Sequence, residues 1–326
     1  MRKFLALAVF ALVVLLAASE FGPPLLLREG SNSSEHTPAP EFTGISTWLN
    51  SSPLTMAGLK GKVVLVQFWT YSCINCLRTL PYVTKWYGKY KDKGFIVIGV
   101  HTPEFSFEKE TSNVATAIKR FGINYPVALD NRYSTWKAYE NQYWPAEYLI
   151  DSSGKIVATQ FGEGNYQKLE DAIARLVGDS LPDARVDDPD LSVIGSPEMY
   201  FGTEKNSGAI VGSQAPEAGE HFYAAPKNVP LDRFALSGNW KLSEDSATSS
   251  ADGDEILLRF RAPKANLVAG SSSPQTLLIT VDGEPQSPVA VQGSQLYSLY
   301  SGSNGEHVLR VTIPKAGLSA FTFTFG

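Results

Sequence analysis

The chain has two cysteines, and they lie three positions apart in the segment Cys73-Ile74-Asn75-Cys76. Residues 63–69, just before them, form an apolar run that is typical of a buried strand. After them, apolar residues recur every three or four positions as far as Tyr87, which is typical of a helix. The pair therefore lies where a strand leads into a helix N-terminus. Unpaired N–H groups and the positive end of the helix dipole favour a thiolate there, and can lower a cysteine pKa from ~8.5 to ~3.5–7.5. The segment predicts a site of thiol–disulfide exchange.

The first half of the chain alternates between strand-like and helix-like segments. In order, the sequence predicts a strand at 63–68, a helix at 76–90, a strand at 95–100, a helix at 114–121, a short strand at 126–129, a short helix around Trp136, a hairpin of strands at 148–150 and 155–158, and a closing helix at 166–176. This is the element order of the thioredoxin fold. We therefore expect an α/β thioredoxin-like domain at residues 39–180.

The pattern changes after residue 180. Asp and Pro are frequent there and apolar residues are few, so we place a linker at 181–194. Beyond it the apolar period falls from 3.6 to 2, with strand-like segments at 256–260, 277–281, 296–300, 308–313 and 321–325. We expect an all-β domain at residues 195–326, built as a sandwich or jelly roll.

The N-terminus has the features of an export signal. Arg2 and Lys3 precede an apolar stretch at 4–18, which is shorter than the ~20 residues of a membrane span, and small residues follow it. We interpret residues 1–38 as a signal peptide plus a polar tether, with an uncleaved signal anchor as the alternative because residues 21–27 are also apolar. The remainder is expected in the periplasm or another extracytoplasmic compartment, where disulfides persist.

The composition restricts the partners. The net charge is −5 and no basic cluster is present, which argues against nucleic acid. Four histidines and two cysteines are too few for an obvious metal cage, and we expect neither a metal nor another cofactor. Zinc would need four ligands. His101 could join the two sulfurs in a copper site, but we interpret it as a loop residue near the end of the sheet.

Four strings of residues carry a family resemblance. Residues 69–81 (Trp-Thr-Tyr-Ser-Cys-Ile-Asn-Cys-Leu-Arg-Thr-Leu-Pro) resemble the active-site segment of the extracytoplasmic part of DipZ-type proteins, which are thioredoxin-like and related to the TlpA/ResA group. The likeness continues in Trp-Pro-Ala-Glu-Tyr-Leu-Ile-Asp at 144–151, Phe-Gly-Glu-Gly at 161–164 and Ser-Pro-Glu-Met-Tyr-Phe-Gly at 196–202. It covers roughly residues 40–326. In that family the β domain resembles a carbohydrate-binding module.

The resemblance implies an extracytoplasmic thiol–disulfide oxidoreductase that acts as a reductase on disulfide-bearing proteins. By this likeness and by its place nearer the helix start, Cys73 is the more exposed, attacking thiolate, and Cys76 resolves the mixed disulfide. Pro145 resembles the cis-proline that faces the cysteines in thioredoxin-fold proteins. Trp69 and Trp144 are expected to flank the cysteines as a docking surface, although either could instead belong to the core.

Three departures from related proteins matter for the mechanism. Gln67 stands where thioredoxin has a buried Asp, and Thr79 stands where ResA-like proteins have a Glu, so both usual proton acceptors are missing. Glu147 is the candidate substitute. DipZ proteins also carry a multi-span membrane domain, which this chain lacks, so we expect a separate membrane electron donor of the CcdA type.

Two other functions remain open on the sequence. The spacing Thr70-x-x-Cys73 resembles that of a thiol peroxidase of the peroxiredoxin type. A glycan-associated binding protein is the second alternative, with stacking by aromatic residues of the β domain: Tyr223, Trp240, Tyr297 and Tyr300. The odd spacing of Tyr297 and Tyr300 predicts that they lie on opposite faces of a sheet.

Overall fold

The structure is a computed structural model. It describes residues 26–27, 37–181, 188, 190–206, 210–211, 216–224 and 226–326. Most of the predicted signal and tether segment, and much of the predicted linker, therefore lie outside the described residues. Below, "N-terminal half" means residues 37–181 and "C-terminal half" means the described residues from 190 onward. No helix among the residues so described is long and apolar enough to cross a membrane.

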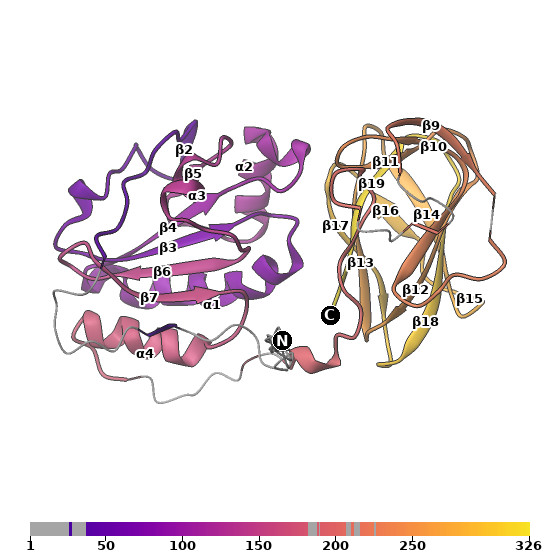
Figure 1. Ribbon diagram of the computed structural model, residues 1–326. Helices are drawn as coiled ribbons and strands as arrows, with labels where there is room; N and C mark the ends of the chain where they lie inside the picture. Colours follow the sequence, from indigo (N-terminus) through magenta and orange to yellow (C-terminus); the bar gives the residue numbers. More distant parts are fainter. Residues whose placement is uncertain are drawn as a thin grey trace, which may run out of the picture.

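A seven-stranded sheet with the order β1-β7-β6-β3-β4-β5-β2 organises the N-terminal half (Figure 1). Its strands are β1 (Leu26–Leu27), β2 (Thr47–Leu49), β3 (Val63–Trp69), β4 (Phe95–His101), β5 (Val127–Leu129), β6 (Ala146–Ile150) and β7 (Ile156–Phe161). The helices are α1 (Ile74–Tyr90), α2 (Thr111–Arg120), α3 (Ser134–Ala138) and α4 (Tyr166–Leu176), with short 3₁₀ turns η1 (Ala57–Leu59), η2 (Lys91–Lys93) and η3 (Ser106–Lys109). The predicted order of elements, and with it the thioredoxin fold, is confirmed.

The central strand β3 is buried along its whole length because helices cover both faces of the sheet. Leu65 belongs to a core cluster with residues of α1 and α4, whereas Val66 packs in a second cluster with Trp136 of α3. This alternation follows the period of two of a strand. Strands β3, β4 and β5 run parallel and β6 runs antiparallel to β3. The chain leaves the C-terminal end of β3 and enters α1 a few residues later.

The C-terminal half is all-β, as predicted, and its strands pair antiparallel in the order β15-β14-β18-β12-β10-β11-β19-β13-β17. The strands are β8 (Met199–Tyr200), β9 (Gly219–Tyr223), β10 (Arg233–Leu242), β11 (Ala247–Ser249), β12 (Asp254–Arg261), β13 (Lys264–Ser271), β14 (Gln275–Val281), β15 (Glu284–Pro285), β16 (Val289–Val291), β17 (Gln295–Ser301), β18 (Glu306–Ile313) and β19 (Leu318–Phe325), preceded by η4 (Leu191–Val193). The first part of β10 pairs with β12 and the second part with β9 and β11. The change occurs at Gly238, whose φ of +95° is a backbone conformation that favours glycine.

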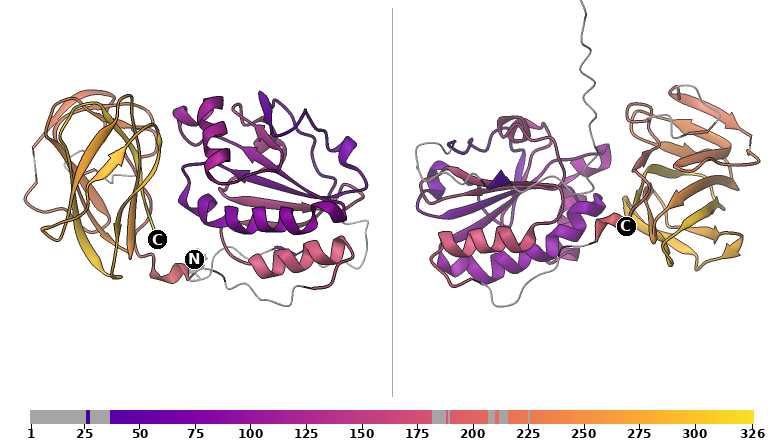
Figure 2. Two further views of the ribbon diagram at one scale, coloured as in Figure 1. Left: turned by 180° about the vertical axis from the view of Figure 1, so that it is seen from behind. Right: turned by 60° about the horizontal axis from the view of Figure 1, so that its bottom comes forward.

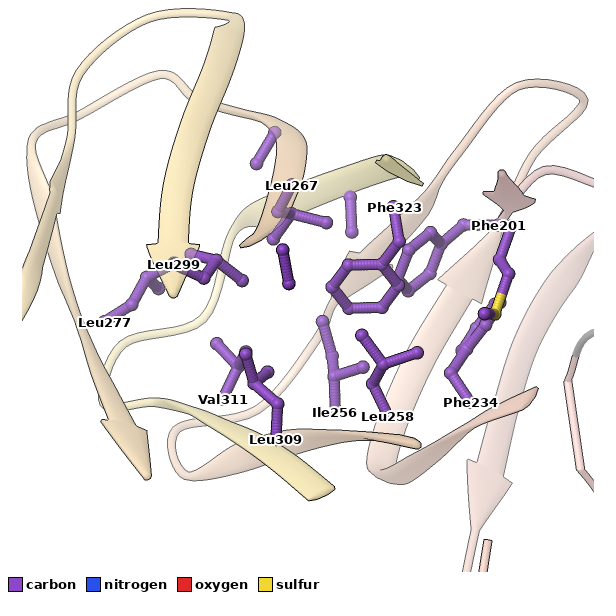
Figure 3. Packing of buried hydrophobic residues seen from close by; sticks show 14 of the residues in the cluster. Phe201, Phe234, Ile256, Leu258, Leu267, Leu277, Leu299, Leu309, Val311 and Phe323 are labelled. Carbon is purple, nitrogen blue, oxygen red and sulfur yellow. The ribbon is translucent and has the colours of Figure 1, made fainter. Parts of the chain in front are cut away.

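Side chains from β13 and β19 meet side chains from β12 and β18 in one core (Figure 3). Leu267 and Phe323 come from β13 and β19, and Ile256 and Leu309 come from β12 and β18. All four are fully buried. Alternate burial along β12, β14 and β18 fits strands with one face on this core.

The aromatic residues considered for sugar stacking lie mostly in this core. Trp240 is fully buried and Tyr297 is 8% exposed. The prediction that Tyr297 and Tyr300 lie on opposite faces is wrong, because both pack against the same core. A register shift between Ala265 and Asn266 of the neighbouring strand breaks the alternation between the two tyrosines.

The two halves lie side by side (Figure 2). Side-chain contacts join them. Phe105 and Phe107, which follow β4, pack on Phe321 of β19 with ring centroids 5.3 and 4.6 Å apart. The Ser106 backbone N–H also donates to Asp245 Oδ2 at 3.0 Å. These contacts bring the C-terminal half close to the end of β3, where the cysteines lie.

Candidate active site

Cys73 lies where β3 ends and α1 begins. It is the N-cap residue of α1, with an extended backbone, and the Cys76 backbone N–H donates to its Sγ at 3.4 Å. Both cysteines are free thiols. Cys73 is 7% exposed and Cys76 is fully buried, so Cys73 is the more accessible thiol of the pair.

The backbone at Trp144 and Pro145 faces this thiol. The Cys73 thiol donates to the Trp144 carbonyl oxygen at 3.9 Å, and the peptide bond between Trp144 and Pro145 is cis, as predicted. The Trp144 indole is half-buried, packs on Trp136 at a tilt of 38° with centroids 4.2 Å apart, and donates from Nε1 to the Thr102 carbonyl at 3.0 Å. Trp144 therefore presents a fixed, partly exposed ring beside Cys73.

Trp69 does not form part of a docking surface. Its side chain is fully buried in the core cluster that also contains both cysteines, and its ring lies edge-on to His101 at 5.3 Å. Of the two alternatives for Trp69, the structure has the core residue, because its odd position on β3 points it to the face covered by α1 and α4. Trp69 instead supports the cysteines from inside the sheet.

The Cys73 thiol is not poised as a thiolate in the way that the helix N-terminus predicts. The hydrogen bond with the Cys76 thiol lowers its pKa, but burial and the negative charges of Glu198 and Glu104 raise it, and the pKa ends above its ordinary value. Burial, followed by the contact with Cys73, raises the pKa of Cys76 well above its ordinary value. Both thiols therefore favour the protonated form.

A buried polar network lies behind the cysteines. Gln67 on β3 pairs in register with Glu147 on β6, and Gln67 Nε2 donates to Glu147 Oε1 at 3.5 Å. The Tyr125 hydroxyl donates to Gln67 Oε1 at 3.2 Å. Burial raises the pKa of Glu147 to about 8. The charge of Glu147 is also one of the influences that raise the pKa of Cys76.

His101 is a strand residue and not the loop residue that the sequence predicts. It ends β4, is fully buried, and has Nε2 3.3 Å from the Thr70 hydroxyl. Burial lowers its pKa to about 3, so the ring is neutral. Among the residues that the structure describes, no three or more His, Cys, Asp or Glu side chains gather where they could hold a metal.

Sequence reasoning missed a polar cluster beside Cys73 that both halves build. Glu104 follows β4, and Glu198, Tyr200 and Lys205 come from the C-terminal half. The Tyr200 hydroxyl lies 2.7 Å from Glu198 Oε2 and 2.9 Å from Glu104 Oε1. Glu198 and Tyr200 belong to the string at 196–202, but nothing in the sequence places that string against the cysteines.

Arg78 was also missed, although it lies in the first turns of α1. Its guanidinium makes two contacts of 2.7 Å with the Glu163 carboxylate, from Nε and from Nη2. It also donates to the Phe325 carbonyl at 3.4 Å. Arg78 therefore ties the cysteine-bearing helix to the last strand of the C-terminal half.

The comparisons with known proteins agree with this geometry. The family model Redoxin matches residues 34–174, and the model Thioredoxin like C-terminal domain matches residues 196–326. The chain is 30% identical over 138 residues to the thiol-disulfide oxidoreductase ResA of Bacillus thuringiensis, covering 42% of this chain and 76% of that protein. It belongs to the thioredoxin-like family of thiol-disulfide oxidoreductases.

Within that family the chain is a homologue of DipZ. It is 39% identical over 301 residues to Protein DipZ of Mycobacterium tuberculosis, which covers 88% of this chain and 43% of DipZ. The chain thus spans less than half the length of the DipZ relatives that it matches. A solved structure described as a thioredoxin-like protein in the oxidized form is 30% identical, covers 44% of this chain and 96% of that one, and has a TM-score of 0.41.

Proposed function

We propose that the chain is an extracytoplasmic thiol–disulfide oxidoreductase that reduces disulfides in other proteins. The observation that supports this best is the pair of free thiols at the start of α1, with Cys73 facing the Trp144 carbonyl at 3.9 Å. In this proposal Cys73 and Cys76 are the catalytic residues, and Pro145 and Trp144 border the surface where substrate binds. The proposed domain limits remain 39–180 and 195–326.

The protonation of the thiols supports the direction of reduction. A low thiol pKa stabilises the reduced form of a Cys-x-x-Cys pair as a thiolate and makes its disulfide a strong oxidant. Here burial and neighbouring carboxylates leave the pKa of both Cys73 and Cys76 raised. This stabilisation of the thiolate is lost, so the pair gives up its electrons more readily.

The reaction has two steps. The Cys73 thiolate attacks one sulfur of the substrate disulfide, the substrate S–S bond breaks, and the other substrate sulfur leaves as a thiolate. Cys76 then attacks Cys73 Sγ, which forms the Cys73–Cys76 disulfide and releases the second substrate sulfur. Two electrons pass to the substrate, and the two thiol protons of the enzyme are balanced by two protons on the product thiols.

Glu147 is the proposed proton acceptor for Cys76. It is 1% exposed and its pKa of about 8 allows the carboxylate to take a proton near neutral pH. Gln67 holds the carboxylate in place through the contact at 3.5 Å. In this role Gln67 positions Glu147 and carries no proton itself.

Each turnover leaves the chain oxidised, so a reductant must restore the dithiol. The resemblance to DipZ supports a membrane electron donor of the CcdA type and an extracytoplasmic location, with the N-terminal segment as signal or anchor. A glycan partner gains little support, because the predicted stacking residues Trp240 and Tyr297 are buried. We therefore propose that the role of the C-terminal half is to form part of the surroundings of Cys73.

The experiment is a trap for the mixed disulfide. The reduced wild-type chain should reduce an insulin-type protein disulfide, while Cys73→Ser abolishes exchange and Cys76→Ser accumulates covalent substrate adducts on Cys73. Peroxide is the comparison substrate. Exchange no faster than that of free cysteine, or a preference for peroxide over the protein disulfide, would refute the proposal.

A further inference from the structure

The polar cluster consists of Glu104, Tyr200, Glu198 and Lys205. Its geometry indicates that one of the two carboxyl groups is protonated. A phenol carries one hydrogen, yet the Tyr200 oxygen lies within hydrogen-bond distance of two carboxyl groups. Both contacts are satisfied by separate hydrogens when one of the two carboxyl groups is protonated and donates to the Tyr200 oxygen. Burial and the charges of Glu104 and Glu198 raise the pKa of Tyr200, so the phenol keeps its own hydrogen.

The surroundings decide which carboxyl group holds the extra proton. Lys205 Nζ lies 3.0 Å from Glu104 Oε1, the same atom that faces Tyr200, so a positive charge lies directly against this carboxyl group. Among the described residues no cation forms an ion pair with Glu198, and the more distant charges of Lys205 and Arg78 only partly offset its desolvation and the charge of Glu104. Tyr200 thus donates to Glu104, and the protonated Glu198 donates to Tyr200.

Rigid contacts fix this cluster next to Cys73. The Glu108 carboxylate accepts from the Ser72 hydroxyl at 2.6 Å and from the Phe105 backbone N–H at 3.0 Å. These are the chain neighbours of Cys73 and Glu104. On the other side, Lys205 Nζ lies 5.9 Å from the centroid of the Trp144 ring, and the Trp144 carbonyl accepts from Cys73.

We propose that Glu198, supplied by the C-terminal half, donates its proton to the substrate sulfur that leaves Cys73. The inference rests on the proposed function and adds a proton donor to it. The departing substrate sulfur is bonded to Cys73 until Cys76 attacks Cys73 Sγ. It therefore leaves from the position of Cys73, beside this cluster. The Glu198 O–H bond breaks, a substrate S–H bond forms, and Glu198 becomes a carboxylate.

Solvent restores the proton after each turnover. A cleft of about 640 Å³ between the halves has Glu104 and Glu204 in its wall, which gives water access to one side of the cluster. Burial, followed by the charge of Glu104, raises the pKa of Glu198 to about 7. The carboxyl group can therefore both give and regain a proton near neutral pH.

The test compares two disulfides that differ in the leaving sulfur. Glutathione disulfide releases an alkyl thiolate that needs a proton, whereas the aryl disulfide DTNB releases a thiolate that is stable without one. In single-turnover reactions of the full chain, Glu198→Gln should slow release of the second thiol from glutathione disulfide about a hundredfold below neutral pH, the low end for a proton donor. With DTNB it should have little effect.

The pH profile supplies a readout that a structural role would not move. Release from glutathione disulfide should fall as the pH rises through the pKa of Glu198, and this fall should be absent in Glu198→Gln. In Glu104→Gln the negative charge that disfavours ionisation of Glu198 is removed, so the fall should move to lower pH. Glu220→Gln, which changes an exposed glutamate on β9 of the same half, is the matched control and should behave as wild type.

Equal slowing with both disulfides, or no slowing with either, would overturn the role of Glu198 while leaving the proposed function intact. Failure of the wild-type chain to reduce either disulfide would instead refute the proposed function. Thermal unfolding of each variant shows whether it is folded. If Glu198→Gln is not folded, the pH profile of Glu104→Gln tests the inference.

Discussion

Gln67 and Glu147 face each other across β3 and β6 in the interior of the sheet, with Gln67 Nε2 3.5 Å from Glu147 Oε1. Neither side chain is more than 1% exposed. The pair places a carboxyl group with a pKa of about 8 behind Cys76, in a chain that lacks the acidic residues found at the equivalent positions of thioredoxin and ResA. If Glu147 accepts the proton of Cys76, as we propose, the second step of the reaction should depend on pH.

Replacing Glu147 by Gln should slow the attack of Cys76 on the mixed disulfide, because the buried thiol loses its proton acceptor. Loss of a general base typically costs ~10²–10⁴-fold, and we expect the effect to lie within this range. The wild-type rate should rise with pH through about 8, and Glu147→Gln should lack this rise. Acid quenching and mass analysis of the Cys73 adduct measure the step. Glu140→Gln, at an exposed position, is the control.

A carboxylate moved to position 67 should restore the function lost in Glu147→Gln. We expect Gln67→Asp combined with Glu147→Gln to recover most of the resolving rate, since the acceptor then lies on β3. Gln67→Asp alone should raise the resolving rate above that of the wild type by less than the double variant raises it above that of Glu147→Gln. The reason is that two facing carboxyl groups share one proton and the second ionises with difficulty. If the larger gain in resolving rate came from Gln67→Asp alone, Glu147 would not be the acceptor.

Glu147 should also make the stability of the chain depend on pH. Its folded pKa of about 8 lies above the value of ~4.3 expected when unfolded, so the folded state binds the proton more tightly. The resulting stabilisation is complete below ~4.3 and is lost as the pH rises through about 8. Relative to Glu147→Gln, the wild type should lose on the order of 1 kcal/mol per pH unit across this window. Urea unfolding at both ends measures it, and a constant difference would contradict it.

The contact between the halves should control access to Cys73. Phe321 is 6% exposed and packs on Phe105 and Phe107, so Phe321→Ala should lower the free energy of unfolding by about 3 kcal/mol. It should also speed alkylation of Cys73 by iodoacetamide, because these phenylalanines hold Glu104 and its cluster against the thiol. Phe222→Ala removes a ring that is 74% exposed and should change neither quantity. Equal alkylation rates in the two variants would show that the contact does not shield Cys73.

Much of the fold follows from patterns that are local in the sequence. The buried run of β3, the Cys-x-x-Cys segment and the apolar spacing of α1 each depend on neighbouring residues, and the structure places them as predicted. The face of Trp69 could also have been predicted, since it has the same parity as Leu65 on one strand. The positions of Tyr297 and Tyr300 could not, because the register shift that aligns them lies in the pairing with β13.

The protonation of Cys73 depends on residues that are distant in the chain. The helix N-terminus alone predicts a lowered pKa, but Glu198 comes from the other half and joins Glu104 in raising it. The packing of Phe105 and Phe107 on Phe321 is one of the contacts that hold Glu198 of the C-terminal half near the thiol. Such a contact leaves no periodic signal in the sequence, and it reverses the expected direction of the shift.

The most direct measurement follows the thiols of the reduced chain during reaction with a protein disulfide. The account predicts that two thiols per chain are consumed, that two appear on the substrate, and that Cys73→Ser abolishes the exchange while Cys76→Ser stops at a covalent adduct on Cys73. A substrate that remains oxidised beside the wild-type chain, or one that is reduced equally well by Cys73→Ser, would contradict it.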